Sequence, residues 1–428
     1  MAFLGMRGSG DWSPEERPTN YRQGLLYLYP NGMMPLTGML SKMAEEKVDD
    51  AQYTWWTKAL AKQRGDLTGV FLNANLTTPY VTGGVAGTTL FVRLSDTQAS
   101  EFKVTHQVLL RKSNNLDLDT NAKVTAVVTN GASSYLACKL LQPDTNGGLV
   151  KLNVADAVLV IGNINSEGGP MPDAVAYDPQ KFFNYIQTLR TSLSITRIAR
   201  RTRLRTEDAY KEAKRESLEL HGIEMEKMFF WGIPTENVGP NGKLERTSGG
   251  LFYFIRAFAP ENVFNYTTDP AFAGRSWLSG GEEWFDSTLE KVSRFGNNDK
   301  MAFAGSGAVL GINRLAKSSG QVWLKSMDTS YGLKVVEWIT PMLTVNLRTH
   351  PLFSYEPTTR NTMVIVEQEE LRYRFIDDTN VVEDEGKHGA SRLDGTNEEW
   401  MTDCGLELHF PLKFAIMSGI NQDNTMVA

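Results

Sequence analysis

A glycine-rich turn at residues 305–311 is the strongest enzyme-like pattern in this 428-residue chain. The residues Gly-Ser-Gly-Ala-Val-Leu-Gly follow an expected strand at 301–304 and open an expected helix at 308–317. In that context, backbone N–H groups bind the pyrophosphate of a dinucleotide. The third glycine comes one position late, however, and the surrounding chain lacks a series of βαβ units. A nucleotide-binding oxidoreductase is therefore one alternative, and an ordinary strand-turn-helix corner is the other.

The densest cationic cluster immediately precedes a long expected helix. Its members are Arg197, Arg200, Arg201, Arg203 and Arg205. Phosphate contacts need only positive charge and reach, so DNA is one partner that the cluster would suit. Guanidinium groups also suit paired contacts with carboxylates, which makes a subunit contact the second interpretation and solvated surface the third. We treat the five arginines as candidate subunit-contact residues and keep a nucleic-acid-binding protein as the second functional alternative.

Patterns for catalysis or metal binding are missing from the sequence. The histidines are scattered without metal-binding spacing: His106, His221, His350, His388 and His409. The sequence has no P-loop and no G-x-S-x-G nucleophile turn. Cys138 and Cys404 lie far apart, and we expect both to be buried as apolar residues. We predict no catalytic residue, no metal and no cofactor, and hence a protein that is not an enzyme.

Composition narrows the class of protein further. The formal net charge is −6 and the pI is about 5.6, which argues against a protein whose main task is to bind phosphates. The length predicts two or three domains. There is no run of ~20 apolar residues and no signal-peptide pattern, so we expect no membrane partner and folding in a reducing cytoplasm.

Two stretches of the chain read as β-structure. Short β segments at 102–110, 123–129, 134–141 and 157–161 predict a small all-β module, with a type I′ hairpin at Asn130-Gly131. Residues 183–196 give a longer strand pattern, interrupted at 186–187. Its expected apolar face consists of Phe183, Tyr185, Leu189, Leu193 and Ile195. A strand of this length needs outside support, which in an assembly protein could be the next subunit.

Helical patterns complete a mixed architecture. A short helix is expected after Pro35, and a long one from Thr206 to the residue before Gly232. The expected buried stripe of the long helix is Ala209, Ala213, Leu220, Ile223 and Met228. We therefore expect Leu220→Asp to cause misfolding. Helices and strands then alternate, with strands at 333–339, 343–347, 362–366 and 406–417, which predicts an α+β fold.

Seven strings of the sequence belong together, in this order: YRQGLLYLYPNGMMPLTGMLSKM, DDAQYTWW, FFNYIQTLRTSLSITRIARRTRL, AYKEAKRESLELHGIEMEKMFFWG, RTSGGLFYFI, YGLKVVEWITPMLTVNLRTHPLF and CGLELHFPLKFAIMSGI. With these strings the sequence resembles the major capsid (coat) proteins of tailed bacteriophages, of the SU-ten podovirus type. The resemblance covers nearly the whole chain apart from the β module.

The resemblance implies an α+β coat fold of the Hong Kong ninety-seven type with an inserted small all-β domain. The expected parts are an N-terminal arm with the first segment of the long hairpin called the E-loop (1–65), the inserted β-rich domain (66–165), the second E-loop arm (166–205), a peripheral domain with a spine helix (206–249), an axial domain (250–358) and a return to the peripheral domain (359–428). We expect the insertion on the outer surface of the shell.

The resemblance also implies a function. The chain is expected to be a major capsid protein of the virion, which self-assembles into hexamers and pentamers of an icosahedral or prolate head shell. Implied partners are scaffolding, portal and decoration proteins, and packaged double-stranded DNA as a weak, non-specific neighbour. Such coat proteins have no catalytic residues that could be transferred to this chain.

Overall fold

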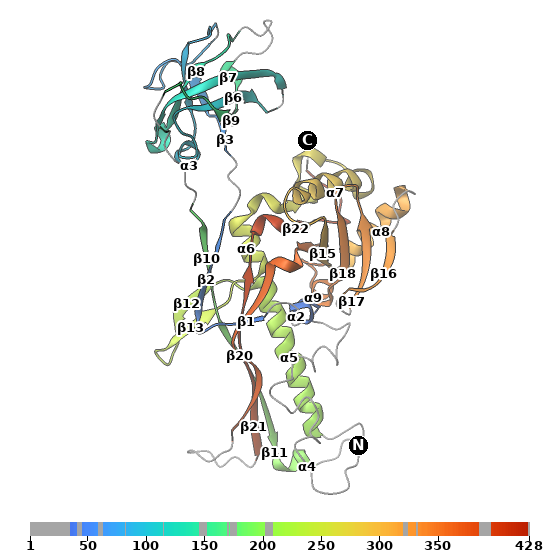
Figure 1. Cartoon of the computed structure of the whole chain (residues 1–428). Coiled ribbons are helices and arrows are strands. Elements are labelled where there is room, and N and C mark those ends of the chain that lie inside the picture. The colour runs from blue at the N-terminus through green and yellow to red at the C-terminus, as the bar shows by residue number, and fades with distance from the viewer. Residues whose placement is uncertain are drawn as a thin grey trace. The chain divides into compact units, whose positions relative to one another are not determined.

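The computed structural model describes residues 35–40, 45–58, 63–81, 83–113, 115–144, 152–168, 171, 178–201, 209–319, 324–330, 333–384 and 395–426. The chain divides into two compact units (Figure 1). One comprises Met1–Thr57 and Lys181–Ala428, and the other Lys58–Gln180. In the sequence, the second unit is inserted between β2 (Gln52–Thr57) and β10 (Gln180–Tyr185), which pair as a two-stranded ribbon.

The inserted unit is an antiparallel sheet with the strand order β3-β9-β6-β7-β8-β5-β4. Its strands are β3 (Arg64–Asp66), β4 (Gly69–Phe71), β5 (Thr89–Arg93), β6 (His106–Lys112), β7 (Asn115–Val128), β8 (Tyr135–Leu140) and β9 (Ala157–Asn163), with helix α3 (Asp96–Ala99). Alternate residues such as Val108 and Leu110 are fully buried, as expected for strands with one face on a core. The prediction of an all-β module is confirmed.

The turn between β7 and β8 differs from the expected type I′ hairpin. Asn130 has a φ of −148°, and Gly131 begins a 3-10 turn that ends at Ser133. Ser134 explains the difference, because its hydroxyl accepts the Asn130 N–H at 2.8 Å and donates to Asp96 at 2.8 Å. These bonds fix a longer turn in which only the glycine has a positive φ.

The larger unit contains a mixed sheet with the order β14-β22-β19-β15-β18-β17-β16. Its strands are β14 (Val263–Asn265), β15 (Asp299–Ala304), β16 (Leu324–Ser330), β17 (Leu333–Ile339), β18 (Thr344–Thr349), β19 (Met363–Val366) and β22 (Ala415–Ser418). Ala302 and Ala304 pack in one core with helices α7 (Trp277–Ser293) and α8 (Ser306–Ser319). Met301 and Phe303 pack in a second core on the other face. Helices therefore cover both faces of this sheet.

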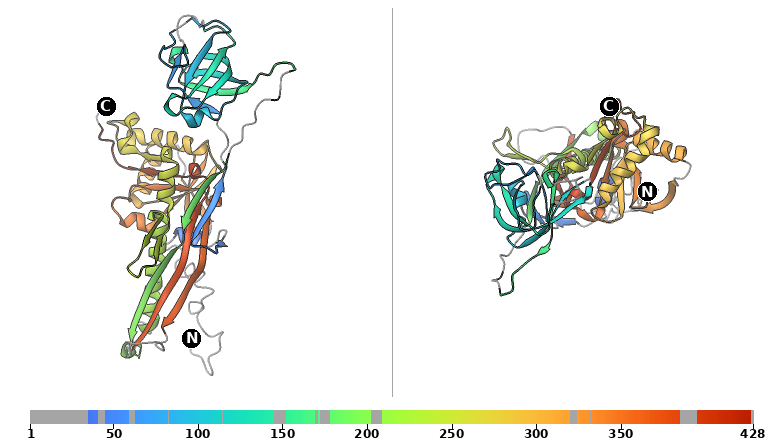
Figure 2. Two further views of the ribbon diagram at one scale, coloured as in Figure 1. Left: turned by 90° about the vertical axis from the view of Figure 1, so that its left-hand side faces the viewer. Right: turned by 90° about the horizontal axis from the view of Figure 1, so that it is seen from above.

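The second core also joins a long sheet to helix α5 (Ala209–Trp231). That sheet has the order β1-β20-β21-β11, formed by β1 (Glu45–Lys47), β11 (Gln187–Thr196), β20 (Leu371–Asp384) and β21 (Gly395–Leu408). Helix α5 lies along these strands (Figure 2). The helices α2 (Pro35–Leu40), α6 (Leu251–Phe258) and α9 (Pro351–Tyr355) and the hairpin of β12 (Thr235–Val238) and β13 (Leu244–Thr247) complete the unit. The α+β class is confirmed.

Helix α5 ends at Trp231 as expected, and Met228 of its predicted stripe is buried, but Leu220 was assigned to the wrong face. Leu220 is 56% exposed, whereas Leu218, His221, Met225 and Phe229 are buried. The spacings of three and four between these four residues define one face of a helix, and Leu220 lies on the opposite face. The error arose because the true inner face includes a histidine. The expected cap at Thr206 lies outside the described residues.

The long strand pattern at 183–196 is two strands, β10 and β11, and the break at Ile186 changes which side chains face inward. In β10 the buried side chains are Phe182 and Asn184, and Phe183 is 43% exposed. In β11 the expected Leu189 and Leu193 are buried. The Ile186 N–H, between the two strands, donates to the carbonyl of Ala51 at 2.8 Å. Phe183 and Tyr185 were therefore assigned to the wrong face.

The expected strand at 406–417 is also interrupted. Strand β21 ends at Leu408, Phe410 takes a left-handed conformation with a φ of 47°, and Pro411 begins a 3-10 turn before β22. Proline has no backbone N–H to give to a strand ladder, so a break at this position is expected. Cys138 and Cys404 are both buried and free, as predicted.

Candidate subunit-contact site

Helix α4 (Arg197–Arg201) carries the described part of the arginine cluster. It follows β11 directly, and the side chains of Arg197, Arg200 and Arg201 are exposed. Arg203 and Arg205 lie outside the described residues. The structure therefore places three of the five candidate residues together on one short helix, where their charges reach the surface.

Arg200 is held in place by the first turn of α5. Its guanidinium carbon lies 4.8 Å from the centroid of the Tyr210 ring, a cation–π contact. The Tyr210 hydroxyl donates a hydrogen bond to Glu398 of β21, and the Lys214 ammonium group lies 3.2 Å from the same carboxylate. Glu398 is therefore already bound within the chain, and it anchors the helix that supports the cluster.

Arg190, on the strand that leads into α4, forms a forked ion pair with a carboxylate of its own chain. Its Nε donates to Glu399 Oε2 at 3.0 Å and its Nη2 donates to Glu399 Oε1 at 2.5 Å. These hydrogen bonds raise the pKa of Arg190 above its ordinary value. The forked arrangement is the one that guanidinium and carboxylate groups adopt when they recognise each other.

A buried carboxylate, Glu226, fixes helix α2 to helix α5. It accepts the N–H groups of Leu36 and Thr37 at 2.8 and 2.7 Å, and His350 Nε2 lies 2.8 Å from its Oε1. Glu226 and His350 are both fully buried. The first N–H groups of a helix have no partner within the helix, so this carboxylate completes α2. Sequence reasoning missed Glu226, because its partners Leu36 and Thr37 lie about 190 residues away in the sequence.

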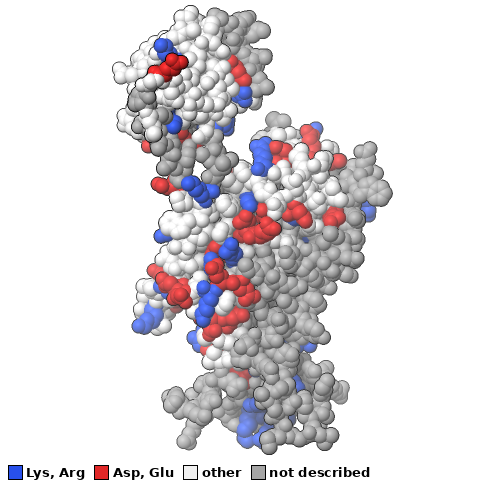
Figure 3. All heavy atoms as spheres, viewed as in Figure 1, with Lys and Arg blue, Asp and Glu red and all other residues white. Residues whose placement is uncertain are grey.

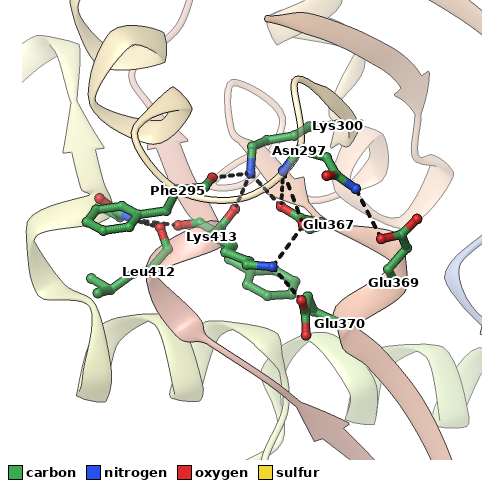
Figure 4. A network of polar contacts seen from close by, with 10 residues as sticks. Phe295, Asn297, Lys300, Glu367, Glu369, Glu370, Leu412 and Lys413 are labelled. Carbon is green, nitrogen blue, oxygen red and sulfur yellow. Dashed lines mark hydrogen bonds and ion pairs between the residues drawn. The ribbon is translucent and has the colours of Figure 1, made fainter. Parts of the chain in front are cut away.

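A second buried polar cluster surrounds Lys300 (Figure 4). The Lys300 ammonium group donates to the carbonyls of Phe295 and Lys413, each at 3.0 Å, and to Glu367 Oε2 at 2.8 Å. Lys413 Nζ lies 3.1 Å from Glu367 Oε1. Burial raises the pKa of Glu367, but the two lysines outweigh this effect and hold the pKa below its ordinary value. The cluster joins β15, β19 and the segment before β22 as a structural element.

The glycine-rich turn at 305–311 is used for packing within the chain. The N–H groups of Gly305 and Ala308 donate to the carbonyls of Thr362 and Arg360, at 3.0 and 3.1 Å. The Ser306 N–H donates to the hydroxyl of Ser354 at 3.1 Å. A Cβ atom at Gly305 would lie 2.3 Å from the Arg360 carbonyl oxygen, so glycine is needed for this close approach. The N–H groups of Gly305, Ser306 and Ala308 therefore already have partners within the chain.

The described part of the chain offers few other sites for chemistry. Within it, no group of three or more His, Cys, Asp or Glu side chains is arranged to hold a metal ion. No helix among the described residues is long and apolar enough to cross a membrane.

Comparisons with known proteins identify the family. The model of the SU10 major capsid protein family matches residues 11–421. A major capsid protein of Pseudomonas phage PaMx41 is 24% identical over 285 residues, which are 62% of this chain and 66% of that relative, just under two thirds of its length. A solved chain from Mycobacterium phage Bobi has a TM-score of 0.38 and 10% identity, covering 81% of this chain and 94% of that one. A chain of the satellite phage P4 procapsid has a TM-score of 0.36 and 15% identity, covering 62% and 87%. Because the family match spans most of the sequence, this chain belongs to the SU10 major capsid protein family.

Proposed function

We propose that this chain is the shell-forming subunit of a tailed-phage head. Copies of it assemble into hexamers and pentamers, and these build the icosahedral or prolate shell around the genome. The family match over residues 11–421 is the observation that carries the proposal. The role requires no catalytic residue and no cofactor. We keep the peripheral, axial and E-loop parts as proposed parts of the larger unit. The inserted unit extends over Lys58–Gln180, beyond the expected 66–165 at both ends, and we place it on the outer surface.

Exposed aromatic side chains on the β2–β10 ribbon support self-assembly. Trp56 is 58% exposed and Phe183 is 43% exposed. The Lys181 ammonium group lies 5.6 Å from the centroid of the Trp56 ring. A two-stranded ribbon is marginally stable alone, and large aromatic residues dominate the binding energy of interfaces. A neighbouring copy that covers these side chains would stabilise both chains.

The arginines of α4 contact carboxylates of a neighbouring subunit in this proposal. They are exposed at the junction between β11 and α5, and the chain has a net charge of −6, so copies offer many carboxylates. Changing Arg200, Arg201 and Arg203 to Gln should then reduce the yield of empty shells, because their partner carboxylates are left unmatched. The matched control neutralises three exposed cations of the inserted unit, Lys58, Arg64 and Lys139.

The alternative for the cluster is contact with packaged DNA. In that case the triple variant would form empty shells at the parental yield, and only filled particles would lose stability, with a strong dependence on salt. Normal empty shells would therefore overturn the subunit contact. Scaffolding, portal and decoration proteins are the further partners that the proposed role implies, and DNA is a weak, non-specific neighbour.

Sedimentation velocity of the freshly expressed full-length chain tests the proposed function. Shell-sized particles, or rings of five and six copies, are the expected species. The same samples are titrated with NAD and with duplex DNA. A small oligomer that binds NAD would favour the oxidoreductase, and one that binds DNA would favour the nucleic-acid-binding protein.

A further inference from the structure

The β12–β13 hairpin carries two exposed apolar side chains at its turn end. Val238 is 70% exposed and Leu244 is 51% exposed, and they are directly opposite each other in the strand register. Opposite residues of an antiparallel pair project to the same face. Together they form one apolar knob. Among the described residues, nothing covers the two side chains, so this face of the hairpin is open to a partner.

The hairpin is fixed at its root. The Thr235 N–H donates to the Thr247 hydroxyl at 3.1 Å, and that hydroxyl donates to the carbonyl of Ile233 at 2.6 Å. Glu236 and Arg246 link the two strands at 2.6 Å. The knob is therefore carried by a preformed element, which lowers the conformational cost of binding a partner.

A pocket of about 580 Å³ lies elsewhere in the same unit, between the last turn of α5 and α9. Trp231, Leu352 and Tyr355 line it, and Tyr355 is 75% exposed. The Trp231 ring stacks on Phe252 with a centroid distance of 5.8 Å, so this wall is held from behind. Lys227, Glu356, Thr358 and Thr359 complete the lining, and the volume is large enough for two aliphatic side chains between the apolar residues.

Charged residues border both the apolar knob and the pocket. Lys227 and Glu356 belong to the pocket, and Lys243 and Glu245 flank Leu244 on the hairpin. Figure 3 shows acidic and basic side chains next to each other over the hairpin. When the knob enters the pocket, each side can therefore offer an opposite charge to the other, which would fix the orientation of the contact.

The occupant of the pocket is a second copy of this chain. Figure 1 shows the β12–β13 hairpin on one side of α5 and α9 on the other, so a hairpin fixed at its root does not reach the pocket of its own chain. A knob and a pocket at different places on one surface form a head-to-tail contact, and such contacts close into rings when the rotation allows it. We infer that Val238 and Leu244 of one subunit insert between Trp231 and Tyr355 of the next subunit around a capsomer ring. This inference rests on the proposed function.

Cysteine cross-linking in assembled particles tests the contact. Leu244→Cys and Tyr355→Cys are made separately in the full-length chain, whose own Cys138 and Cys404 are buried. Particles co-assembled from the two variants should give a disulfide-linked dimer after mild oxidation, and particles with both changes in every copy should give a ladder up to the ring size. Particles of either single variant are the controls. Co-assembled particles that form normally but give no dimer would overturn the inference.

Removal of the knob provides the second measurement. Val238→Ser with Leu244→Ser should reduce particle yield by about tenfold or more, since a few buried apolar residues carry most of the energy of an interface. Leu278→Ser on α7 is the matched control, because Leu278 is 59% exposed and lies away from the hairpin. Unchanged yield with unchanged thermal melting would contradict the contact. If the parent chain itself forms no particles, the proposed function fails instead.

Discussion

Acidification from pH 7 to pH 5 should weaken the packing of helix α5 on the long sheet through one residue, His221. Its side chain is fully buried, and its Nδ1 and Nε2 lie 2.9 and 2.7 Å from the hydroxyls of Thr191 in β11 and Thr402 in β21. Burial lowers the pKa of His221 from 6.5 to about 4. The neutral imidazole is therefore part of the folded packing.

The direction of the effect follows from proton uptake. An unfolded histidine binds a proton near pH 6.5, whereas folded His221 stays neutral until the pH approaches its pKa of about 4. The contribution of neutral His221 to the free energy of unfolding is therefore fully present above pH 6.5 and is lost as the pH falls toward 4. At pH 7 almost nothing is lost, and at pH 5 the loss is about 2 kcal/mol, calculated at 1.36 kcal/mol per pKa unit.

Urea unfolding of the full-length, unassembled subunit at both pH values measures this loss. The comparison variant is His221→Gln, because Gln keeps a donor and an acceptor for the two threonine hydroxyls but does not titrate. Carboxylates titrate in both proteins, so the difference between them isolates the histidine. The variant should lose about 2 kcal/mol less on acidification. Equal losses of stability in the parent and the variant would refute the assignment of this effect to His221.

Three further predictions concern buried contacts of the larger unit. Leu220→Asp should change the thermal melt little, since Leu220 is 56% exposed. Leu218→Asp should give an insoluble or unfolded chain, because Leu218 is 2% exposed. Similar behaviour of the two variants would mean that another face of α5 is buried. Lys300→Met should lower the free energy of unfolding in urea by about 3–5 kcal/mol, because the buried Glu367 loses the Lys300 ammonium group as a partner. A decrease under ~1 kcal/mol would contradict this role of Lys300. Glu226→Gln should cost about 1–3 kcal/mol and speed proteolysis within residues 35–40, while an unchanged cleavage rate would argue against its role in holding α2.

Local signals in the sequence predicted much of the fold. Gly232 and Pro234 mark the end of α5 correctly, because glycine ends helices and proline does not continue them. The apolar residues after Pro35 give the short helix α2, with Leu36, Met39 and Leu40 buried. These features depend on neighbours along the chain, which the sequence contains directly. The family resemblance supplied the rest of the expected architecture.

The errors in helix α5 and at Ile186 have a common physical cause in contacts between distant segments, whereas the turn at 130–134 and the break at Pro411 have local causes. Glu226 contacts Leu36 and Thr37 across about 190 residues, and His221 contacts Thr402 across 181. Burying a polar side chain is unfavourable unless it finds hydrogen-bond partners. Because the partners here lie far away in the sequence, the periodicity of α5 alone assigns such a side chain to the surface. The inner face of α5 was missed for this reason. The break at Ile186 likewise depends on Ala51, far away in the sequence.

Electron microscopy of particles assembled from the full-length chain decides whether this protein forms a capsid shell. We expect closed shells whose surface lattice consists of hexamers and pentamers, with density for the long sheet and for helix α5 in every subunit. Discrete dimers or tetramers, with no closed shell or capsomer ring at any protein concentration tested, would contradict it.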